Sequence, residues 1–229
     1  MVIGIFSDAH GNEPGFYKCY EFLVKHTDSI YYLGDAVGYF PLSNKIIDTL
    51  RSNNINCLKG NHDAMLLGDL EYDNKLEEIY HIKKSRNAIT EKNLNFLRGL
   101  ISEKKITIDN RNLLFVHGSP PDPLKGYIYP DTDINFFEKL PYDAIFMGHT
   151  HWPFIKNAGN KNIVNVGSCG LPRDVGNKLT VALFDTIKNE ASLKEFEMNV
   201  EAVLTKYGTQ IHSTVIDVLH RNNKTFNNE

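Results

Sequence analysis

The stretch AIFMGHTH, residues 144–151, places two histidines directly after an apolar run that is typical of a buried strand. In extended backbone, side chains at i and i+2 point to the same side, so His149 and His151 are expected to face one common point. An isolated His-x-His pair is more often two histidines in a surface loop than a pair of ligands. The other segments of the chain decide between these two interpretations.

The bulk composition predicts a single globular domain spanning 1–229. Of the 229 residues, 41% are hydrophobic, which is enough for one well-buried core, and no Pro-, Gly- or Ser-rich linker divides the chain. The net charge of −3 is spread along the chain, which argues against an extended nucleic-acid-binding face. The cysteines form no CxxC pair, the first ten residues lack a signal-peptide pattern, and no apolar run is long enough to span a membrane. A cytoplasmic protein is expected.

Short β-type runs alternate with helical patterns in the first half of the chain. Strands are predicted at 2–6, 29–35 and 55–61, and helices at about 14–25 and 41–51. Strands separated by helices of this length form βαβ units. The sequence therefore predicts an α/β fold with a mostly parallel sheet.

The pattern changes after the third predicted strand. Residues 64–100 are predicted to form two helices inserted over one end of the sheet, the first carrying Leu76, Ile79, Tyr80 and Lys83, the second carrying Leu94, Leu97 and Leu100 after the N-cap candidate Thr90. From residue 104 onward, short β-type runs joined by tight turns predict a second, mixed sheet. A terminal amphipathic helix is predicted around 211–219, followed by a frayed polar tail at 221–229.

Five polar segments, each just after a predicted strand, gather the residue types that bind metal ions. They are SDAHGN (7–12), LGDAVGY (33–39), KGNHDA (59–64), FVHGSP (115–120) and MGHTHW (147–152). Loops that follow parallel strands meet at one edge of the sheet, so these side chains should converge. Any one segment has an ordinary explanation as a turn, but five in order favour a metal site. The other four histidines (His26, His81, His212 and His220) lack this context and are expected in solvent or packing roles.

The candidate ligands suit a particular group of metals. They are Asp8, His10, Asp35, Asn61, His117, His149 and His151. Carboxylate, amide and imidazole ligands without a thiolate favour Mn²⁺, Fe or Zn²⁺ over Ca²⁺. Seven candidates exceed what one ion with open positions needs, so two ions are predicted, and the two oxygens of Asp35 could bridge them.

The five segments, in this order, resemble the motifs of the calcineurin-like metallophosphoesterase superfamily: D-x-H, GD, GNH[DE], H and GHxH. The match spans residues 7–151, and NVGSCGLPRD (165–174) resembles a loop of the smaller bacterial members. GDAVGYF resembles the bacterial branch grouped with diadenosine tetraphosphatases. The resemblance implies a four-layer α/β/β/α sandwich of two mixed sheets, with the helical insertion at 64–100 over the active site.

The resemblance also implies residue roles. Asp8, His10, Asp35 and His151 would hold one ion, and Asp35, Asn61, His117 and His149 the other, with Asp35 bridging. A hydroxide between the ions would be the nucleophile, and His62 would protonate the leaving oxygen. Asn12 and Arg173 are candidates for contacts to the phosphate, although Arg173 could equally be an ordinary surface arginine.

The second motif departs from that of the protein Ser/Thr phosphatases, which carry GDxVDRG. Gly38 and Tyr39 stand where those enzymes have the aspartate that orients the catalytic histidine and the arginine that grips the phosphate. His62 therefore lacks its usual partner, and whether Asp63 replaces that partner is left open. Tyr39 and Phe40 could instead wall the site for a group such as a nucleoside, or simply pack in the core.

The expected function is two-metal hydrolysis of a small or nucleotide-like phosphoester, with Mn²⁺ as the first choice of metal. The Pro-rich loop at 119–127 and the helical insertion would wall the pocket. The alternatives are a protein Ser/Thr phosphatase, a nuclease, or a non-catalytic scaffold of the same fold like the retromer subunit. The sequence leaves the natural substrate and the oligomeric state open.

Overall fold

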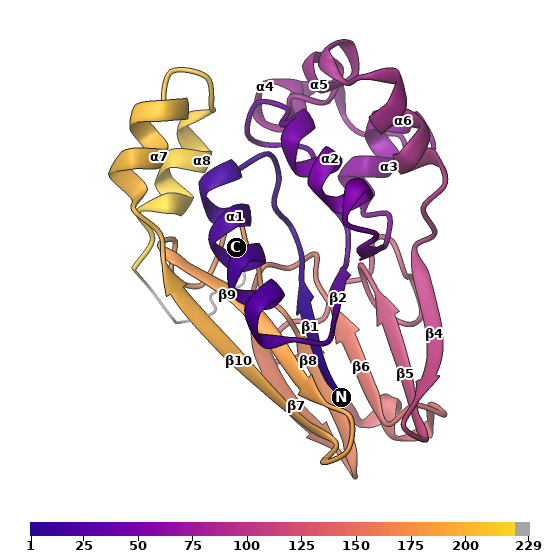
Figure 1. Cartoon of the computed structure of the whole chain (residues 1–229). Helices are drawn as coiled ribbons and strands as arrows, with labels where there is room; N and C mark the ends of the chain where they lie inside the picture. The colour runs from indigo at the N-terminus through magenta and orange to yellow at the C-terminus, as the bar shows by residue number, and fades with distance from the viewer. Residues whose placement is uncertain (223–229) are drawn as a thin grey trace.

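The computed structural model describes residues 1–222, so most of the predicted tail at 221–229 lies outside the described residues. Two five-stranded mixed sheets stack face to face (Figure 1). The first has the order β10-β9-β1-β2-β3 and the second β4-β5-β6-β8-β7. The strands of the first sheet are β1 (Val2–Phe6), β2 (Ser29–Tyr32), β3 (Asn56–Cys57), β9 (Lys178–Asp185) and β10 (Glu190–Glu197). Those of the second are β4 (Glu103–Ile108), β5 (Arg111–Val116), β6 (Ala144–Met147), β7 (Phe154–Ala158) and β8 (Lys161–Asn165).

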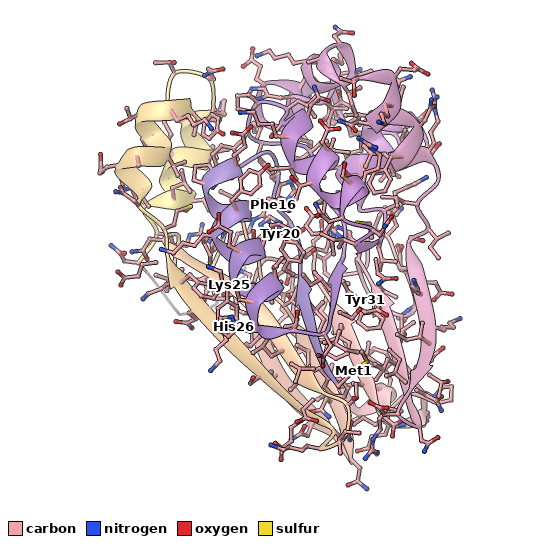
Figure 2. The ribbon with its side chains drawn as sticks, viewed as in Figure 1. Met1, Phe16, Tyr20, Lys25, His26 and Tyr31 are labelled. Carbon is pink, nitrogen blue, oxygen red and sulfur yellow. The ribbon has the colours of Figure 1, made fainter. Side chains whose placement is uncertain are left out.

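Alternation along β1 builds two cores at once. Ile3 and Ile5 point into the core between the sheets, whereas Phe6 packs on the opposite face under the helices. Across the interior, the Tyr31 ring stacks on Phe115 with centroids 4.2 Å apart and planes 7° apart, which joins the two sheets. Tyr31 is labelled in Figure 2. This alternation is the reason for the four-layer α/β/β/α architecture.

The outer layers differ in kind. The outer face of the first sheet is covered by α1 (Glu13–His26). The C-terminal helices α7 (Val200–Tyr207) and α8 (Ser213–Leu219) belong to the same apolar core. Phe16 and Tyr20 of α1 stack with ring centroids 5.8 Å apart (Figure 2). The outer face of the second sheet is covered by a loop and the 3₁₀ helix η2 (Asn135–Lys139), whose Phe137 is fully buried. On that side the helical layer is reduced to one short turn.

Two of the predicted strands belong to a different sheet from the one expected. Residues 178–185 and 190–197 form β9 and β10, which extend the first sheet because β9 pairs antiparallel with β1. The second sheet is completed within residues 103–165. The first sheet is therefore mixed rather than mostly parallel.

The segment 64–100 forms more and shorter helices than the two predicted. It contains most of α3 (Asn61–Leu67), then η1 (Asn74–Leu76), α4 (Glu77–Tyr80), α5 (Ile82–Ala88) and α6 (Glu91–Arg98). The first predicted helix is wrong because His81 adopts a left-handed φ of 55°, which separates α4 from α5. The second is confirmed as α6, with Thr90 as its N-cap. Together with α2 (Asn44–Ser52), these helices gather at one end of the sheets (Figure 1).

The C-terminal region contains one predicted helix and one that was not predicted. The amphipathic pattern around 211–219 forms α8, while α7 precedes it without having been expected. Among the described residues, no helix is long and apolar enough to cross a membrane.

Candidate metal centre

The five polar segments converge at the end of the sheets where the parallel strands finish. Strands β1, β2 and β3 run parallel in the first sheet, and β5 and β6 run parallel in the second. The segments that follow them bring together Asp8, His10, Asp35, Asn61, His117, His149 and His151, each of which is at most 8% exposed. The carboxyl edges of two sheets therefore enclose one buried polar cluster.

The backbone that presents these side chains is left-handed rather than extended. Asp8, His10, Asp35, His149 and His151 all have φ between 50° and 66°, a region that non-glycine residues rarely adopt. The common direction predicted for His149 and His151 assumed extended backbone, and these residues are not extended. Their rings enter two different groups of ligands.

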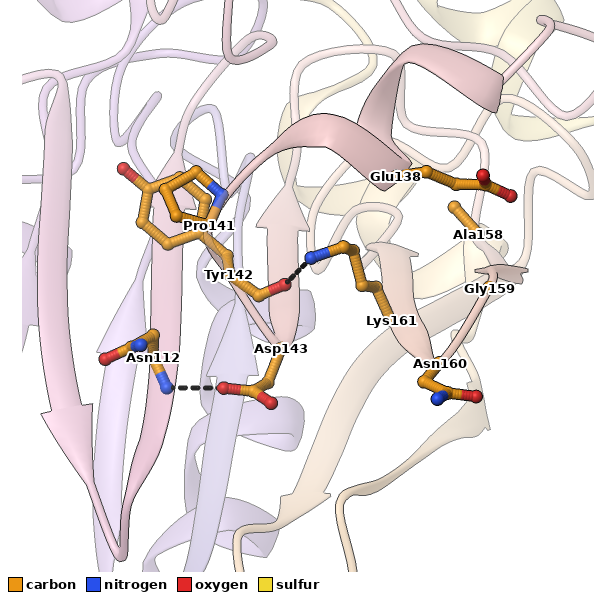
Figure 3. A pocket seen from close by; sticks show the side chains of 9 residues that line it. All are labelled: Asn112, Glu138, Pro141, Tyr142, Asp143, Ala158, Gly159, Asn160 and Lys161. Carbon is orange, nitrogen blue, oxygen red and sulfur yellow. Dashed lines mark hydrogen bonds between the residues drawn. The ribbon is translucent and has the colours of Figure 1, made fainter.

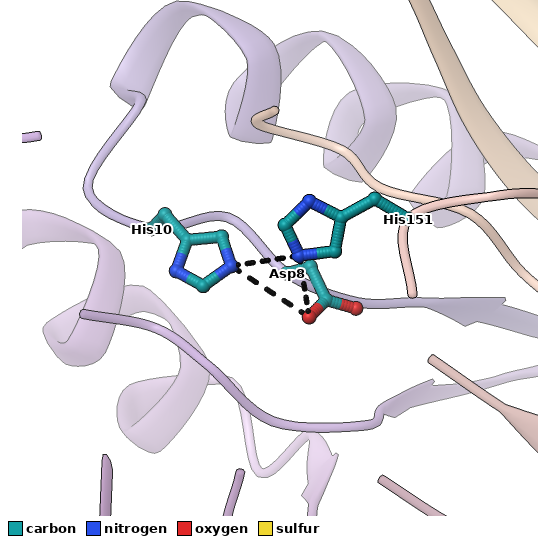
Figure 4. Close-up of side chains that lie close together, drawn as sticks. All are labelled: Asp8, His10 and His151. Atoms are coloured by element: carbon teal, nitrogen blue, oxygen red, sulfur yellow. Dashed lines mark hydrogen bonds and ion pairs between the residues drawn. The ribbon is translucent and has the colours of Figure 1, made fainter. Parts of the chain in front are cut away.

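The first group contains Asp8, His10 and His151 (Figure 4). The Nε2 atoms of His10 and His151 are 3.0 Å apart, and the Asp8 Oδ1 lies 3.7 Å from the former and 3.2 Å from the latter. Asp35 Oδ2 lies 3.8 Å from the His10 Nε2. Two ring nitrogens and a carboxylate thus surround one small volume.

The second group contains Asp35, His117 and His149. The His117 Nε2 lies 3.4 Å from Asp35 Oδ2 and 2.9 Å from the Asn61 amide oxygen. The His149 Nε2 is buried without a hydrogen-bond partner. Asp35 lies between the two groups, because its Oδ2 is near both His10 and His117.

Backbone carbonyls fix the orientation of three of the four rings. The Nδ1 atoms of His10, His117 and His151 lie 2.9, 3.0 and 2.6 Å from the carbonyl oxygens of Val37, Leu33 and Leu171. A carbonyl oxygen can only accept, so each Nδ1 carries a hydrogen and each Nε2 is turned toward the carboxylates. A metal-binding histidine usually donates its other ring N–H in this way, which holds the ring in position.

The cluster fits divalent cations on its own geometry. In neutral rings the Nε2 lone pairs of His10 and His151 face each other at 3.0 Å, which requires positive charge between them. Asp8 Oδ1 and His149 Nε2 are buried atoms without a hydrogen-bond partner. Buried polar groups are rarely left unpaired, and bound ions are one explanation for those that are.

The protonation states suit ligation. Burial opposes ionisation of Asp8 and Asp35, but neighbouring histidines hold the pKa of both carboxyls below the ordinary value. Burial lowers the pKa of His149 to about 3 and that of His151 to about 4, so both rings are neutral. Burial also disfavours a charged His117, yet Asp35 raises its pKa to about 9. A proton and a metal ion would therefore compete for the His117 Nε2.

His62 lies beside the cluster with its ring enclosed by aromatic groups. The centroids of His10, Tyr39 and Tyr80 lie 4.9, 4.9 and 4.6 Å from that of His62. Its Nδ1 is buried without a hydrogen-bond partner. A β-carbon on Gly38, whose φ is +102°, would lie 2.4 Å from this Nδ1, so the glycine makes room for the ring.

Asp63 does not replace the missing carboxylate partner of His62. Its Oδ2 accepts hydrogen bonds from the Asp35 and Gly60 amides, and its Oδ1 accepts one from the Ala36 amide. These contacts tie α3 to the loop that carries Asp35. The role of Asp63 is thus to shape the ligand loops.

Asn12 does not fit the predicted contact to a phosphate. Its Oδ1 accepts from the Gly15 amide as the N-cap of α1, and its Nδ2 donates to the Gly170 carbonyl at 2.7 Å. The side chain is fully buried, so the structure commits it to the fold. Phe40 is also fully buried, with its ring on Tyr207, and cannot wall the site.

Arg173 lies at the edge of the cluster. Its backbone amide donates to the His151 carbonyl at 3.3 Å, and its guanidinium donates to the Tyr39 hydroxyl at 2.7 Å. The side chain is half-buried rather than fully exposed. Tyr39 thus holds a positive charge beside the candidate ligands.

The sequence interpretation missed two tyrosines next to the cluster, Tyr80 from α4 and Tyr127 from the Pro-rich loop. The Tyr127 ring centroid lies 4.3 Å from that of His149. The sequence predicted that the helical insertion at 64–100 and the loop at 119–127 would wall the pocket, but it did not identify these side chains. Which side chains turn inward depends on the break at His81 and on the turns of the loop.

Within residues 1–222, the other histidines and one polar surface hollow carry no comparable cluster. His26 stacks on Phe22, His81 is buried, His212 caps α8 and His220 is exposed. A polar hollow lies beside η2 and the turn between β7 and β8 (Figure 3). There Asp143 accepts from the Asn112 amide and Lys161 donates to the Tyr142 carbonyl, so these groups hold the loops together.

Comparisons with known proteins agree with this geometry. A family model described as the calcineurin-like phosphoesterase superfamily domain matches residues 1–189. An uncharacterised protein of Methanocaldococcus jannaschii is 30% identical over 224 residues, which cover 90% of this chain and 91% of that protein. A hypothetical protein from Pyrococcus horikoshii OT3 aligns with a TM-score of 0.81 at 20% identity, covering 98% of this chain and 99% of that one. A metallophosphoesterase from Sphaerobacter thermophilus aligns with a TM-score of 0.76 at 24% identity, covering 96% and 98%. Both of these solved structures share the fold of this chain.

Proposed function

This chain belongs to the calcineurin-like phosphoesterase superfamily, and we propose that it binds two divalent ions, Mn²⁺ before Fe or Zn²⁺, to hydrolyse a small phosphoester. The family makes the protein a metal-dependent hydrolase of phosphoesters. The number of ions, the preferred metal, the substrate and the residue roles are the proposal. The observation that carries it is that two groups of candidate ligands, one with Asp8 and one with His117, meet at Asp35. Asp35 also lies with His10 and His62 in a third possible metal-binding group.

The ligands divide between the ions according to these groups. Asp8, His10, Asp35 and His151 would hold one ion, and Asp35, Asn61, His117 and His149 would hold the other. The seven side chains include two carboxylates, so two divalent ions would leave a local charge of +2. Charge in such a buried site is poorly screened, so phosphate is attracted despite the net charge of −3.

The chemistry combines the ions with two neighbouring side chains. When bound, the ions would supply Lewis-acid stabilisation of phosphoryl oxygens and would lower the pKa of water toward about 7, which would provide a nucleophile at neutral pH. His62 would give a proton to the leaving oxygen, since its ring lies against His10 of one group and near Asp35 of the other. Burial lowers the pKa of the free His62 ring, so the ring would take up that proton as the anionic phosphate binds beside it. Arg173 binds a phosphate oxygen, with its guanidinium oriented by the Tyr39 hydroxyl.

A direct assay tests the proposal. Metal-stripped protein is supplied with p-nitrophenyl phosphate or bis-p-nitrophenyl phosphate, with and without Mn²⁺, Fe²⁺ and Zn²⁺. We expect hydrolysis of at least one substrate to appear with metal and to be fastest with Mn²⁺. Asp35→Asn should remove most of it, because a neutral amide bridges two cations poorly, whereas Asp217→Asn on the exposed face of α8 should not.

No turnover of either substrate by metal-loaded wild-type protein would contradict the proposal and favour a non-catalytic scaffold. The usual protein-phosphatase site is absent here, because Gly38 and Tyr39 replace its aspartate and arginine. We place the protein in the cytoplasm, because its three cysteines are free thiols, which is typical of a reducing compartment.

A further inference from the structure

Tyrosines from three separate segments border the metal centre, and they differ in how far they are engaged. Tyr39 is buried, with its hydroxyl on Arg173 and its ring against His10. Tyr80 is half-buried, with its ring edge-on to both Tyr39 and His62. Both of these rings pack on groups of the site itself. Tyr127 is different, because 55% of it is exposed although its ring lies beside a candidate ligand.

The Tyr127 ring has two aromatic neighbours, His149 and Tyr129. Its centroid is 4.3 Å from that of the His149 imidazole, and the two planes are tilted by 43°. Tyr129 stacks with it almost in parallel, with centroids 5.9 Å apart and planes 12° apart. Two neighbours thus hold the ring in place, and more than half of its surface remains available to a ligand.

The loop that carries Tyr127 is rigid enough to present the ring. Asp122 organises it: its carbonyl accepts the Ser119 and Gly126 amides, and its carboxylate accepts the Lys125 amide at 3.0 Å. A β-carbon on Gly126 would collide with Ser119, so the turn is closely packed. The next residue, Ile128, is buried in the outer core of the second sheet. Tyr127 itself is not in that core, and its ring lies against His149 of the centre instead.

We propose that Tyr127, supported by Tyr129, is a stacking platform for a flat aromatic ring of the substrate. This inference rests on the proposed function, since the phosphate must be held at the ions for the attached ring to reach the platform. The substrates are then phosphoesters that carry an aromatic ring, such as nucleoside phosphates or aryl phosphates. Stacking accepts any flat ring, because every base has a π-face, and so it selects a class rather than one compound.

Equilibrium binding tests the platform without turnover. Benzylphosphonate and methylphosphonate share one phosphonate group, whose C–P bond is not an ester, and they differ by the aromatic ring. Both are titrated by calorimetry into Mn²⁺-loaded wild-type protein and into Tyr127→Ala, Tyr127→Phe and Phe136→Ala variants. Phe136 is an exposed aromatic residue on η2 that serves as the matched control.

We expect wild-type protein to bind benzylphosphonate about 5- to 150-fold more tightly than methylphosphonate, which is the usual worth of one stacked ring. Tyr127→Ala should lower this ratio at least about fivefold while leaving methylphosphonate affinity unchanged. Tyr127→Phe and Phe136→Ala should keep the wild-type ratio.

Two different failures can be told apart. The platform would be overturned if wild-type protein bound benzylphosphonate no more tightly than methylphosphonate, or if Tyr127→Ala kept the same preference as wild type. In either case, metal-dependent turnover of bis-p-nitrophenyl phosphate would still support the proposed function. Absence of both metal-dependent phosphonate binding and turnover would reject the proposed function and the platform together.

Discussion

Five of the seven candidate ligands are held on left-handed backbone. Each such non-glycine residue costs on the order of 1–3 kcal/mol and persists only where the surrounding structure imposes it. Here the Asp8 amide donates to the Gly34 carbonyl and the His10 amide to the Asp35 carbonyl, both at 3.0 Å. The loops after β1 and β2 therefore brace each other. Backbone strain concentrated in ligand loops supports a functional centre.

His62 gives the sharpest test among single residues. His62→Ala should keep the metal content of wild type and lower kcat by about 10²–10⁴, the usual contribution of a general acid. The loss should be smallest for esters with good leaving groups, which need little protonation. Metal content by mass spectrometry and kcat for a series of aryl phosphates measure both effects. Loss of a metal ion in this variant would contradict the role of proton donor.

At the residue scale, the sequence predicted which candidate ligands come together but not the direction of every side chain. The residues at the ends of strands come together because strand ends meet, and this is readable from the order of the segments. Asn12 could not be assigned in the same way. Its side chain serves as a cap and joins Gly170, which is 158 residues away in the chain. Only the folded loop reveals that contact.

The N-terminus of α1 links that helix to the loop at 165–174. Asn12→Ala removes a cap and the donor to Gly170, so we expect a loss of about 1–3 kcal/mol of unfolding free energy in metal-free protein. The affinity of the Mn²⁺-loaded protein for methylphosphonate should stay as in wild type. Urea denaturation and calorimetry provide the two measurements.

Asn199→Ala is the matched control, because Asn199 caps α7 through its Oδ1 and the Ala202 amide. Asn199→Ala should lower the unfolding free energy by less, about 0.5–2 kcal/mol, because only the helix cap is lost. A clear drop in methylphosphonate affinity in Asn12→Ala with unchanged stability would restore Asn12 as a phosphate ligand.

Most helices and strands could be predicted from local sequence patterns, whereas the neighbours with which they pair or pack could not. β9 is a mainly apolar run that fits the interior of either sheet, and its place is decided by antiparallel pairing with β1. The break between α4 and α5 likewise depends on the backbone at His81, while the apolar spacing from Leu76 to Lys83 runs straight through it. Tertiary context overrides propensity in both cases.

At the scale of the whole molecule, the metal centre joins the two sheets. The candidate ligands come from loops after β1, β2 and β3 on one side and β5 and β6 on the other. A bound ion would therefore bridge elements that the apolar interior already holds together. Metal binding should accordingly stabilise the complete fold.

We expect Mn²⁺ at about 100 times its dissociation constant to add about 2.7 kcal/mol, which corresponds to a rise in Tm of about 5–10 °C for a chain of this size. Differential scanning calorimetry of metal-stripped protein with and without Mn²⁺ measures the shift. His151→Asn should lose much of it, whereas His220→Asn, at an exposed histidine outside the centre, should keep it. An equal shift in both variants would mean that Mn²⁺ binds elsewhere.

The overall architecture was predictable because five ordered motifs specify it. The composition of the outer layers was not predictable. Among the residues that the structure describes, the second sheet has η2 and a loop alone on its outer face, because the segment between β5 and β6 contains little helical pattern. The platform at Tyr127 arises in that same connection. Its turns are fixed by Asp122 and Gly126, whose effect on the direction of one ring emerges only in the folded loop.

The most direct test of the account is anomalous X-ray scattering from crystals saturated with Mn²⁺. We predict two anomalous peaks per chain, about 3.5–4 Å apart, with Asp35 between them. His149 should ligate one peak and His151 the other. A single peak at saturation, or both histidines on the same peak, would contradict the two-ion centre.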